Sequence, residues 1–377
     1  MTRTQRYLLA LAVIAMLAPE TSQAQNSVHG VRGIGFPGRP LSVRARALGG
    51  AWGVFDRTSA INPASVAGLT ALTASGTYGA TLRRYDIGAT SVSGLVETRF
   101  PHGYLGGSVG RSRMSFAMSL STYAEQSFDL TTTETIDIGG VPTVVEDRVK
   151  SDGGIVDARA AFGYRASSRV LLGAALHLIR GSSRLSAGRD FIDSNLQPFE
   201  ETADLSFSGV GVSAGIVWRL AGERAQLGLA GRWDHKLTST LNNGSSTTTD
   251  LPLWFVGGFT TQLSASLVWT VAGEFRNWSV ADEDLPQANA YNTWSAQSGL
   301  EFGALTSRLP LRIGGRYATL PFSGSEQPHE VGLSAGTGTR LAGGRGQLDL
   351  TFERLFRRGG GASENGWHFT FGITVQP

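Results

Sequence analysis

Few residues in this chain of 377 amino acids have the types and spacing that catalysis requires. Gly106 to Gly110 read Gly-Gly-Ser-Val-Gly, which matches the G-x-S-x-G pattern of a serine nucleophile on a strand-to-helix turn. Fifty glycines make a chance match expected, and no helical pattern follows this serine. The six histidines stand singly, without the i, i+4 spacing of a zinc-binding helix. The sequence predicts that the protein is not an enzyme.

Metal and redox chemistry have equally little support. The chain contains no cysteine, which removes thiolate metal sites, disulfides and cysteine nucleophiles together. The run Asp282-Glu283-Asp284 resembles a calcium contact weakly, and a solvated charged loop explains it better. The sequence therefore predicts no metal site and no cofactor.

Charge and composition exclude further classes of protein. With 33 basic and 30 acidic residues the chain is nearly neutral, so we expect no nucleic-acid partner. Eight Trp, eighteen Phe and eight Tyr are spread along the chain, which argues against disorder. Beyond the N-terminus no apolar run approaches the roughly 18 to 20 residues of a spanning helix. A helical membrane protein is therefore excluded.

The first 24 residues have the layout of a secretory signal peptide. Arg3 and Arg6 precede an unbroken apolar run from Leu8 to Ala18, which is too short to cross a bilayer. Small residues at Ser22 and Ala24 fit a signal peptidase site, so we expect cleavage near Ala24. Without a second apolar helix, the mature chain is either soluble outside the inner membrane or a β-barrel.

Strict alternation of side-chain character favours strands, and it is clearest near the C-terminus. One parity is wholly apolar and the other polar or small: Trp367, Phe369, Phe371, Ile373 and Val375 against His368, Thr370, Gly372, Thr374 and Gln376. Arg354 is the one exception on the apolar parity of the preceding segment. The alternating segments run about 12 to 20 residues, which suits tilted membrane strands of about 9 to 11 residues better than sandwich strands of about 5 to 6.

Fourteen such segments, from 70–83 to 364–376, can be delimited in the chain. From the third segment on, long and short connections alternate: long at 129–145, 186–198, 242–248 and 281–289, and short at 167–168, 221–223 and 264. Outer-membrane barrels combine tight periplasmic turns with longer extracellular loops and an even number of strands. The sequence predicts an all-β transmembrane barrel of about 14 antiparallel strands in the bacterial outer membrane, surrounded by its lipid.

In such a barrel the apolar parity faces lipid and the opposite parity faces the lumen. The charged residues on the inner parity are the predicted lumen lining: Asp157, Arg159, Arg165, Arg232, Asp234, Lys236, Glu274, Arg276, Arg312, Arg316 and Glu353. Both signs occur in similar number, so we expect many of them to pair across strands. His177 and His368 share this parity and are expected to be satisfied wall histidines near acidic groups.

Residues 25–69, which precede the first strand, do not alternate and are too many for a linker. A barrel of fourteen strands encloses more space than its wall side chains fill, because about eight strands already have a filled interior. We therefore divide the chain into a signal peptide at 1–24, a plug or hatch at 25–69 and the barrel at 70–377.

The plug contains Ala45-Arg-Ala-Leu48-Gly-Gly-Ala51, followed after a spacer by Ala60-Ile-Asn62-Pro63-Ala64 and Gly68-Leu69. This run resembles the opening of FadL-like outer-membrane proteins, the long-chain fatty acid transporter family, and of the related PorV/PorQ proteins. The resemblance implies a fourteen-stranded barrel whose hatch carries Asn62, Pro63 and Ala64. It also implies hydrophobic substrates that leave sideways through the wall. A Met usual in the Gly-Gly motif is missing, and Asn-Pro alone also starts ordinary turns.

Two further sites are predicted on this basis. A lateral opening needs a defect in the barrel wall, and the run from Pro101 to Gly110 between the second and third segments contains enough glycine to bulge or kink. The candidate residues are Gly103, Gly106, Gly107 and Gly110. A periplasmic turn of unusual length explains this run equally well. An apolar ligand groove is expected from plug and loop residues: Ile34, Phe36, Trp52, Phe55, Phe191, Ile192 and Phe199. The first function hypothesis is passive uptake of a hydrophobic small-molecule ligand, such as a long-chain fatty acid, gated by the plug. The alternative is a non-transporting barrel that docks secretion-system proteins.

Overall fold

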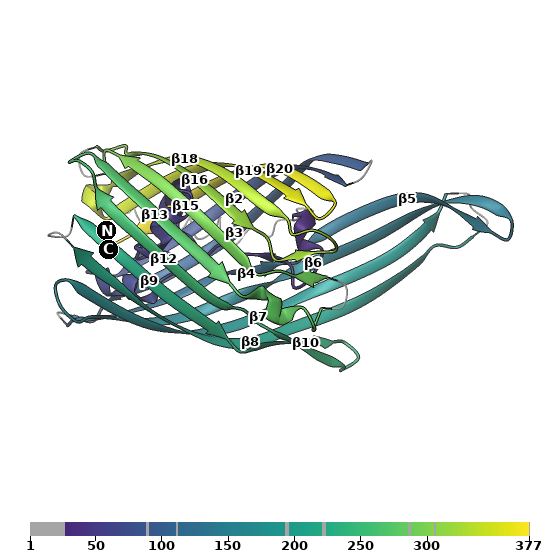
Figure 1. Ribbon diagram of the computed structural model, residues 1–377, viewed down its shortest axis with the longest axis horizontal. Helices are drawn as coiled ribbons and strands as arrows, with labels where there is room; N and C mark the ends of the chain where they lie inside the picture. Colours follow the sequence, from purple (N-terminus) through teal and green to yellow (C-terminus); the bar gives the residue numbers. More distant parts are fainter. Residues whose placement is uncertain are drawn as a thin grey trace, which may run out of the picture.

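The computed structural model describes residues 27–87, 90–110, 112–192, 196–220, 224–285, 288–304 and 307–376, with the backbone alone described for 87 and 90–100. The predicted signal peptide at 1–24 lies outside these residues. The described chain forms a closed antiparallel barrel of fourteen wall strands around an N-terminal plug (Figure 1). Antiparallel pairing of the last strand with the first closes the wall. The fourteen-stranded barrel predicted from alternation is confirmed.

The wall strands are β2 (Thr73–Ile87), β3 (Thr90–Ser108), β4 (Met114–Glu125) continued by β5 (Phe128–Ile138), β6 (Val141–Arg165), β7 (Val170–Phe191), β8 (Phe199–Leu220), β9 (Ala225–Asp234) continued by β10 (Lys236–Leu241), β11 (Ser246–Asp250) continued by β12 (Leu253–Gln262), β13 (Leu267–Arg276), β15 (Thr293–Phe302), β16 (Leu311–Thr319), β18 (His329–Leu341), β19 (Gly346–Gly359) and β20 (Ala362–Val375). The short strands β14 (Asn289–Ala290) and β17 (Phe322–Ser323) pair with each other outside this wall. No described helix is long and apolar enough to cross a membrane.

Two of the predicted long loops are mostly strand. Residues 129–145 form the hairpin of β5 and β6 around Gly139 and Gly140, and residues 242–248 narrow to a tight turn between β10 and β11. The prediction of long loops there was wrong because the strands continue beyond the barrel. In Figure 1 the β5–β6 hairpin projects far from one end, while the C-terminus lies at the other. Short turns gather at the C-terminal end, which is the periplasmic end by the usual asymmetry of such barrels.

The outward face of the sheet changes character where β6, β7 and β8 leave the barrel. Lower on β6, Asp157 points into the lumen, and Ile155 above it is fully buried. In the projecting part the inward face is mixed, with Val149 and Leu185 beside the ion pair of Asp147 with Arg189, whereas the outward face, apolar lower down, carries many charges. The outward charged residues are Asp129, Glu146, Arg148, Lys150, Arg184, Asp190, Glu200 and Asp204. Charged outward residues belong in water, so this change marks the outer edge of the membrane.

The plug consists of short elements that lie inside the barrel (Figure 1). They are η1 (Val28–Gly30), β1 (Phe36–Pro37), α2 (Val43–Ala47), η2 (Ala51–Val54) and η3 (Pro63–Gly68). Ser42 starts α2 by accepting a hydrogen bond from the backbone N–H of Ala45 (3.2 Å). Asp56 accepts bonds from the hydroxyls of Ser42 and Ser59, the latter at 2.7 Å, and so joins two turns of the plug. The plug is therefore held by side-chain caps rather than by long helices.

Candidate functional site

The η3 segment of the plug rests on a row of wall glycines. Gly163, Gly173 and Gly215 are cross-strand partners on β6, β7 and β8. A Cβ at Gly173 would lie 2.3 Å from the backbone carbonyl of Pro63, and one at Gly163 would lie 2.4 Å from the backbone nitrogen of Ala67. No side chain larger than hydrogen fits between wall and plug at these positions.

A second pair of wall glycines contacts the plug across the lumen, at the C-terminal end of α2. A Cβ at Gly314 would lie 2.2 Å from the backbone nitrogen of Gly49, and one at Gly299 would lie 2.7 Å from Leu48. These two wall glycines are themselves cross-strand partners on β15 and β16. Many of the fifty glycines that composition revealed thus serve to bring the plug backbone against the wall.

The predicted hatch element lies against the first of these two groups of wall glycines. Asn62 is fully buried; its side-chain oxygen accepts from the N–H of Ala64 (2.9 Å), and its amide donates to the carbonyl of Ile216 (3.3 Å) on β8. Pro63 follows as the first residue of η3, where its missing N–H costs nothing. Asn62, Pro63 and Ala64 therefore form a helix cap that also bonds the plug to the wall.

Ion pairs join the plug to the opposite side of the barrel. Glu353 on β19 accepts from Arg39 and from Arg46 (3.2 Å), both of which belong to the plug. Arg44 pairs at 2.6 Å with Glu301, which also pairs with Arg312 of the wall at 2.8 Å. Breaking a buried pair by removing one partner costs about 3–5 kcal/mol. The plug therefore supplies both arginine partners of Glu353 and a second arginine partner for Glu301.

The inner face of β6, β7 and β9 carries a separate polar cluster. Asp157 accepts from Arg232 (2.6 Å) and from Nδ1 of His177 (2.9 Å), whose Nε2 lies 2.9 Å from the hydroxyl of Ser213. His177 is thus the satisfied wall histidine that the sequence predicted. Arg159 differs from its neighbours, since it is 2% exposed and none of its three guanidinium nitrogens has a hydrogen-bond partner among the described residues.

Most of the residues predicted to line the lumen have side chains that face the interior. Those that face the interior are Asp157, Arg159, Arg165, Arg232, Asp234, Glu274, Arg276, Arg312, Arg316 and Glu353. Lys236 is the exception, because it is exposed and pairs with Asp250 at 3.0 Å. The strand breaks at His235, so that Leu237 rather than Lys236 turns inward.

The outer mouth of the barrel is closed by an apolar cluster. Trp278, on a short helix η5 (Trp278–Ala281), meets Phe322 edge-on with ring centroids 5.1 Å apart. Phe322 also covers Gly33 of the plug, where a Cβ would lie 2.5 Å from its ring. The buried members are Ile34, Ala124, Ile155, Ile179, Phe207, Leu237, Leu251, Trp278, Ala281, Ala290 and Phe322, which we call the mouth cluster.

The mouth cluster corrects the predicted ligand groove, whose members do not come together. Trp52 and Phe55 pack beside each other (centroids 5.9 Å apart) and border the periplasmic opening. Phe36 lies beside the guanidinium of Arg357 (4.1 Å to the ring centroid), while Phe191 and Phe199 lie on the projecting strands and Ile192 follows the end of β7. Of the predicted set, Ile34 alone is a member of the mouth cluster. The mouth cluster could have been predicted from the apolar residues that lie on the inner parity near the outer ends of the strands, such as Ile155 and Ile179.

The wall has a gap between β3 and β4. Their ladder runs from Ser108 to His102, opposite Ser115 to Ser121, and stops there. At that level β3 is bulged, with Phe100 and Pro101 unpaired opposite β2. Beyond it β4 pairs with plug strand β1 instead, through Phe36 opposite Glu125 and Pro37 opposite Ala124. The plug therefore stands where β3 would continue the sheet.

The predicted lateral opening lies beside this gap rather than in a turn. Gly103, Gly106 and Gly107 lie within β3 and pair with β4, and Gly103 and Gly106 also pair with β2, so the prediction that they separate two strands was wrong. Gly110 lies in the following periplasmic turn. Ser108 ends a strand and its hydroxyl donates to the carbonyl of Thr70 (3.2 Å). No helix follows it, so the nucleophile pattern lacks its structural setting.

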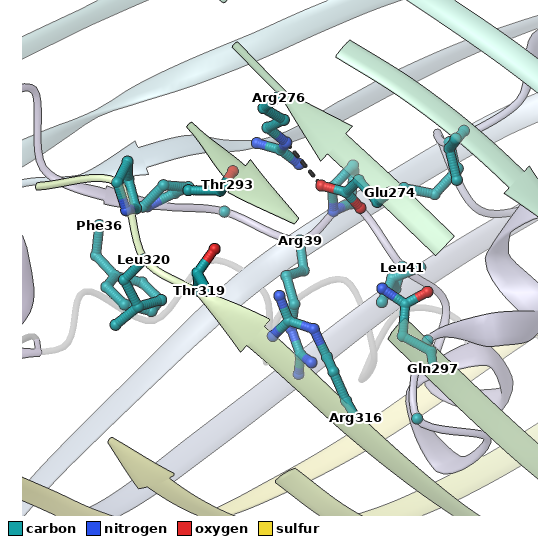
Figure 2. Close-up of a pocket in the computed structure, with 18 of the residues that line it drawn as sticks. Phe36, Arg39, Leu41, Glu274, Arg276, Thr293, Gln297, Arg316, Thr319 and Leu320 are labelled. Atoms are coloured by element: carbon teal, nitrogen blue, oxygen red, sulfur yellow. Dashed lines mark hydrogen bonds and ion pairs between the residues drawn. The ribbon is translucent and has the colours of Figure 1, made fainter. Parts of the chain in front are cut away.

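A space of about 460 Å³ between plug and wall opens at the periplasmic end, beside Trp52 and Phe55, whereas the spaces deeper in the barrel are small. One of about 60 Å³ lies between plug and wall, with Arg39 and Arg316 reaching into it from either side and Glu274 paired to Arg276 at 2.7 Å (Figure 2). Another of about 80 Å³ lies against Pro101 and Pro37 at the gap. A dry apolar cavity that binds benzene is about 150 Å³. Neither of these two spaces can hold even a small aromatic ring in this conformation.

The acidic loop is structural. Asp282 accepts from the N–H of Ala290 (2.6 Å), and Asp284 accepts from the N–H of Asp250 (2.7 Å). These bonds tie the η5 segment to β14 and β11 above the mouth cluster. The described residues contain no group of three or more His, Asp or Glu side chains that could hold a metal ion.

No protein-family model matches the chain, and no curated protein matches it in sequence. Solved structures do resemble it. A Pseudomonas aeruginosa FadL homologue aligns with 90% of this chain and 99% of its own, at 15% identity and a TM-score of 0.62. The Ralstonia pickettii toluene transporter TbuX has 12% sequence identity and a TM-score of 0.60, and the CymD monoaromatic hydrocarbon channel has 13% identity and a TM-score of 0.57. Each of the two aligns with 90% of this chain and 98% of its own. The chain has the FadL-type barrel fold.

The FadL-type fold confirms the architecture implied by the Ala45–Ala51 and Asn62-Pro63-Ala64 runs. It supports an outer-membrane location. The similar structures are described as transporters and channels, so the alternative of a barrel that docks secretion proteins gains no support from them.

Proposed function

We propose that this protein is an outer-membrane channel for the uptake of hydrophobic small molecules, such as long-chain fatty acids, gated by its N-terminal plug. The observation that carries the proposal is the gap between β3 and β4, which plug strand β1 fills. A ligand that leaves through the wall reaches the lipid directly and avoids the charged periplasmic end of the lumen.

The apolar surfaces are placed to receive such a ligand from outside. The inward faces of the projecting strands lead from Leu185 and Val149 down to Ile155 and the mouth cluster. From there Ile34 connects the cluster to β1, which covers the gap. Because the cavity at the gap is only about 80 Å³, smaller than an aromatic ring needs, passage through the gap requires the plug to move away from the wall.

The polarity beside the gap favours an acidic amphiphile over a pure hydrocarbon. Four arginines and one glutamate line the cavity there: Arg39, Arg46, Arg83, Arg357 and Glu125. These arginines pair with Glu353, Glu330 and Glu364 of the wall, and a ligand carboxylate can accept from their remaining N–H donors, which a hydrocarbon cannot do. This supports fatty acids as the first ligands to test.

A reversible crosslink tests both the route and the gate. Because the chain has no cysteine, Pro37→Cys with Ala124→Cys creates a single thiol pair at partnered positions of β1 and β4. Paired strand residues have Cα atoms about 4.5–5.5 Å apart, within the range a disulfide spans. In proteoliposomes, oxidation is expected to stop uptake of a labelled fatty acid and reduction to restore it.

The matched control is Thr260→Cys with Thr270→Cys, which joins two wall strands whose hydroxyls lie 2.8 Å apart. This crosslink leaves the plug free and should not alter uptake. Equal uptake by the oxidised and reduced Pro37–Ala124 pair would refute gating at the gap. Uptake of toluene without uptake of any fatty acid would refute the proposed ligand class while leaving the route intact.

A further inference from the structure

Arg354 is a charged residue among the lipid-facing apolar residues Leu348, Leu350, Phe352 and Phe356 of β19, and its surroundings show why it is tolerated. Its cross-strand neighbours Leu333 and Trp367 are lipid-facing, 57% and 46% exposed. The guanidinium lies 4.6 Å from the ring centroid of Phe356 and 5.0 Å from that of Trp367. No carboxylate among the described residues pairs with it. Arg354 therefore points its charge along the outside of the barrel.

The position of Arg354 along the strand places it at the outer membrane boundary. It lies eight residues from Gly346, where β19 leaves the periplasmic turn. At about 3.4 Å per residue and a tilt of about 40°, this is a height of roughly 20 Å, near the top of an apolar band about 25 Å tall. The rows below it on β19 and β20 are apolar, including Phe352 and Phe369. Headgroups of the outer leaflet begin at the level of Arg354.

Two more arginines occupy the same face just above. Arg358 lies two rows higher on β19, is exposed, and likewise has no carboxylate partner among the described residues. Arg84 lies on β2 in the row between them, with its side chain 61% exposed. Asp86 also lies on this face, 3.8 Å from Arg84 and 3.5 Å from the hydroxyl of Ser363. Three guanidinium groups therefore gather on this face, and two of them, those of Arg354 and Arg358, have no carboxylate partner among the described side chains.

We propose that Arg354, Arg358 and Arg84 form a binding site for the phosphate of an anionic lipid headgroup in the outer leaflet. Guanidinium groups bind phosphate oxygens through paired N–H donors, which makes arginine well suited to this ligand. The rings of Phe356 and Trp367 hold Arg354 at the lipid boundary, where an acyl chain can lie below the phosphate. This site is separate from the lumen and from the proposed uptake route, since it lies on the outside of the wall.

The test compares the protein in nanodiscs of phosphatidylcholine with and without phosphatidylglycerol, using native mass spectrometry to count bound anionic lipid and thermal unfolding to measure its effect. Each arginine near an anionic surface contributes about 1 kcal/mol, or roughly five-fold in affinity. The double variant Arg354→Gln with Arg358→Gln should therefore lose roughly 20- to 30-fold. Arg354→Lys keeps the charge but loses the paired donors and the contact with the two rings, so its binding should fall between that of the wild type and that of Arg354→Gln.

Arg113→Gln is the matched control, because Arg113 is an exposed arginine at the opposite, periplasmic end. If it weakens binding as much as the double variant, or if the double variant binds like the wild type, the proposed site is wrong. Inorganic phosphate added to phosphatidylcholine nanodiscs should have no effect; an equal thermal shift would mean that the site binds free phosphate instead. Should the double variant fail to fold, the single exposed change Arg358→Gln must still show a loss of roughly five-fold.

Discussion

Replacing Gly173 with alanine tests whether the glycine rows seat the plug. The new Cβ would lie 2.3 Å from the carbonyl carbon and oxygen of Pro63, and these atoms are backbone, which cannot rotate away. Restoring an ordinary contact requires η3 to move by about 1 Å. Overpacking of this kind typically costs about 1–3 kcal/mol. The same movement would stretch the 2.9 Å and 3.3 Å hydrogen bonds of Asn62.

We therefore expect Gly173→Ala to loosen the plug while the wall stays folded. Because alanine suits a strand better than glycine does, the barrel itself should lose no stability. The expected result is a higher ion conductance of the reconstituted protein in planar bilayers and faster proteolysis of residues 27–69. Heat-modifiability on a denaturing gel checks that the wall still forms.

The matched control is Gly273→Ala on β13, where the new Cβ would meet its nearest heavy atom, the carbonyl oxygen of Ser295, at 3.7 Å. This change adds the same methyl group to the wall without touching the plug. If both variants conduct and resist protease like the wild type, the glycine rows do not seat the plug. If both leak equally, the effect belongs to the wall and the reasoning is again refuted.

Three further outcomes follow from the described contacts. Arg232→Leu should lower the unfolding midpoint sharply, because it leaves the buried carboxylates of Asp157 and Asp234 without their arginine partner, at a cost of about 3–5 kcal/mol. Arg159→Leu removes a guanidinium that has no hydrogen-bond partner among the described residues, so its effect on stability should be neutral or stabilising. Equal losses of stability in the two variants would contradict this contrast. Burial lowers the pKa of His29, so the unfolded segment takes up a proton below about pH 6.5 before the folded one does. The protection factor of amide hydrogen exchange over residues 27–37, corrected for the intrinsic slowing of exchange at lower pH, should therefore fall as pH drops below that value, and His29→Gln should abolish the dependence. Asn62→Ala should destabilise η3 by about 1 kcal/mol, which is measured as faster proteolysis of the plug. Unchanged proteolysis would show that the hydrogen bonds of Asn62 to Ala64 and Ile216 contribute little to the stability of the plug.

Local periodicity was enough to predict the wall. In a strand each side chain's face follows from its neighbours at i−2 and i+2, so the Trp367–Val375 series and the inner position of Asp157 could be predicted without tertiary information. The same rule failed at Lys236, because the strand breaks at His235 and the parity shifts there. It also failed for 129–145, where alternation continues but apolar residues face inward instead of outward.

The candidate site was less predictable because it depends on contacts between distant segments. Asn62-Pro63-Ala64 could be placed in the plug by resemblance, but the glycines that receive it are chosen by cross-strand register. Phe191 and Trp52 share an apolar character, yet one lies on a projecting strand and the other near the periplasmic end. Nothing local in the sequence reports that separation. The gap filled by β1 likewise follows from where the β3–β4 ladder stops, which composition cannot reveal.

The change along the outward face of β6, β7 and β8 has a consequence for how these strands find their alignment. A slip of one residue would turn Asp157 toward lipid below the membrane edge, and above it would turn Leu185 toward water and the charged outer row inward. The two errors occur in different solvents, and neither can be relieved by correcting the other. Both the bilayer and the water above it therefore favour the same register for each pair of neighbouring strands. The long projecting hairpin, which as an isolated two-stranded ribbon would be prone to slide, is thereby fixed in register by the wall from which it grows.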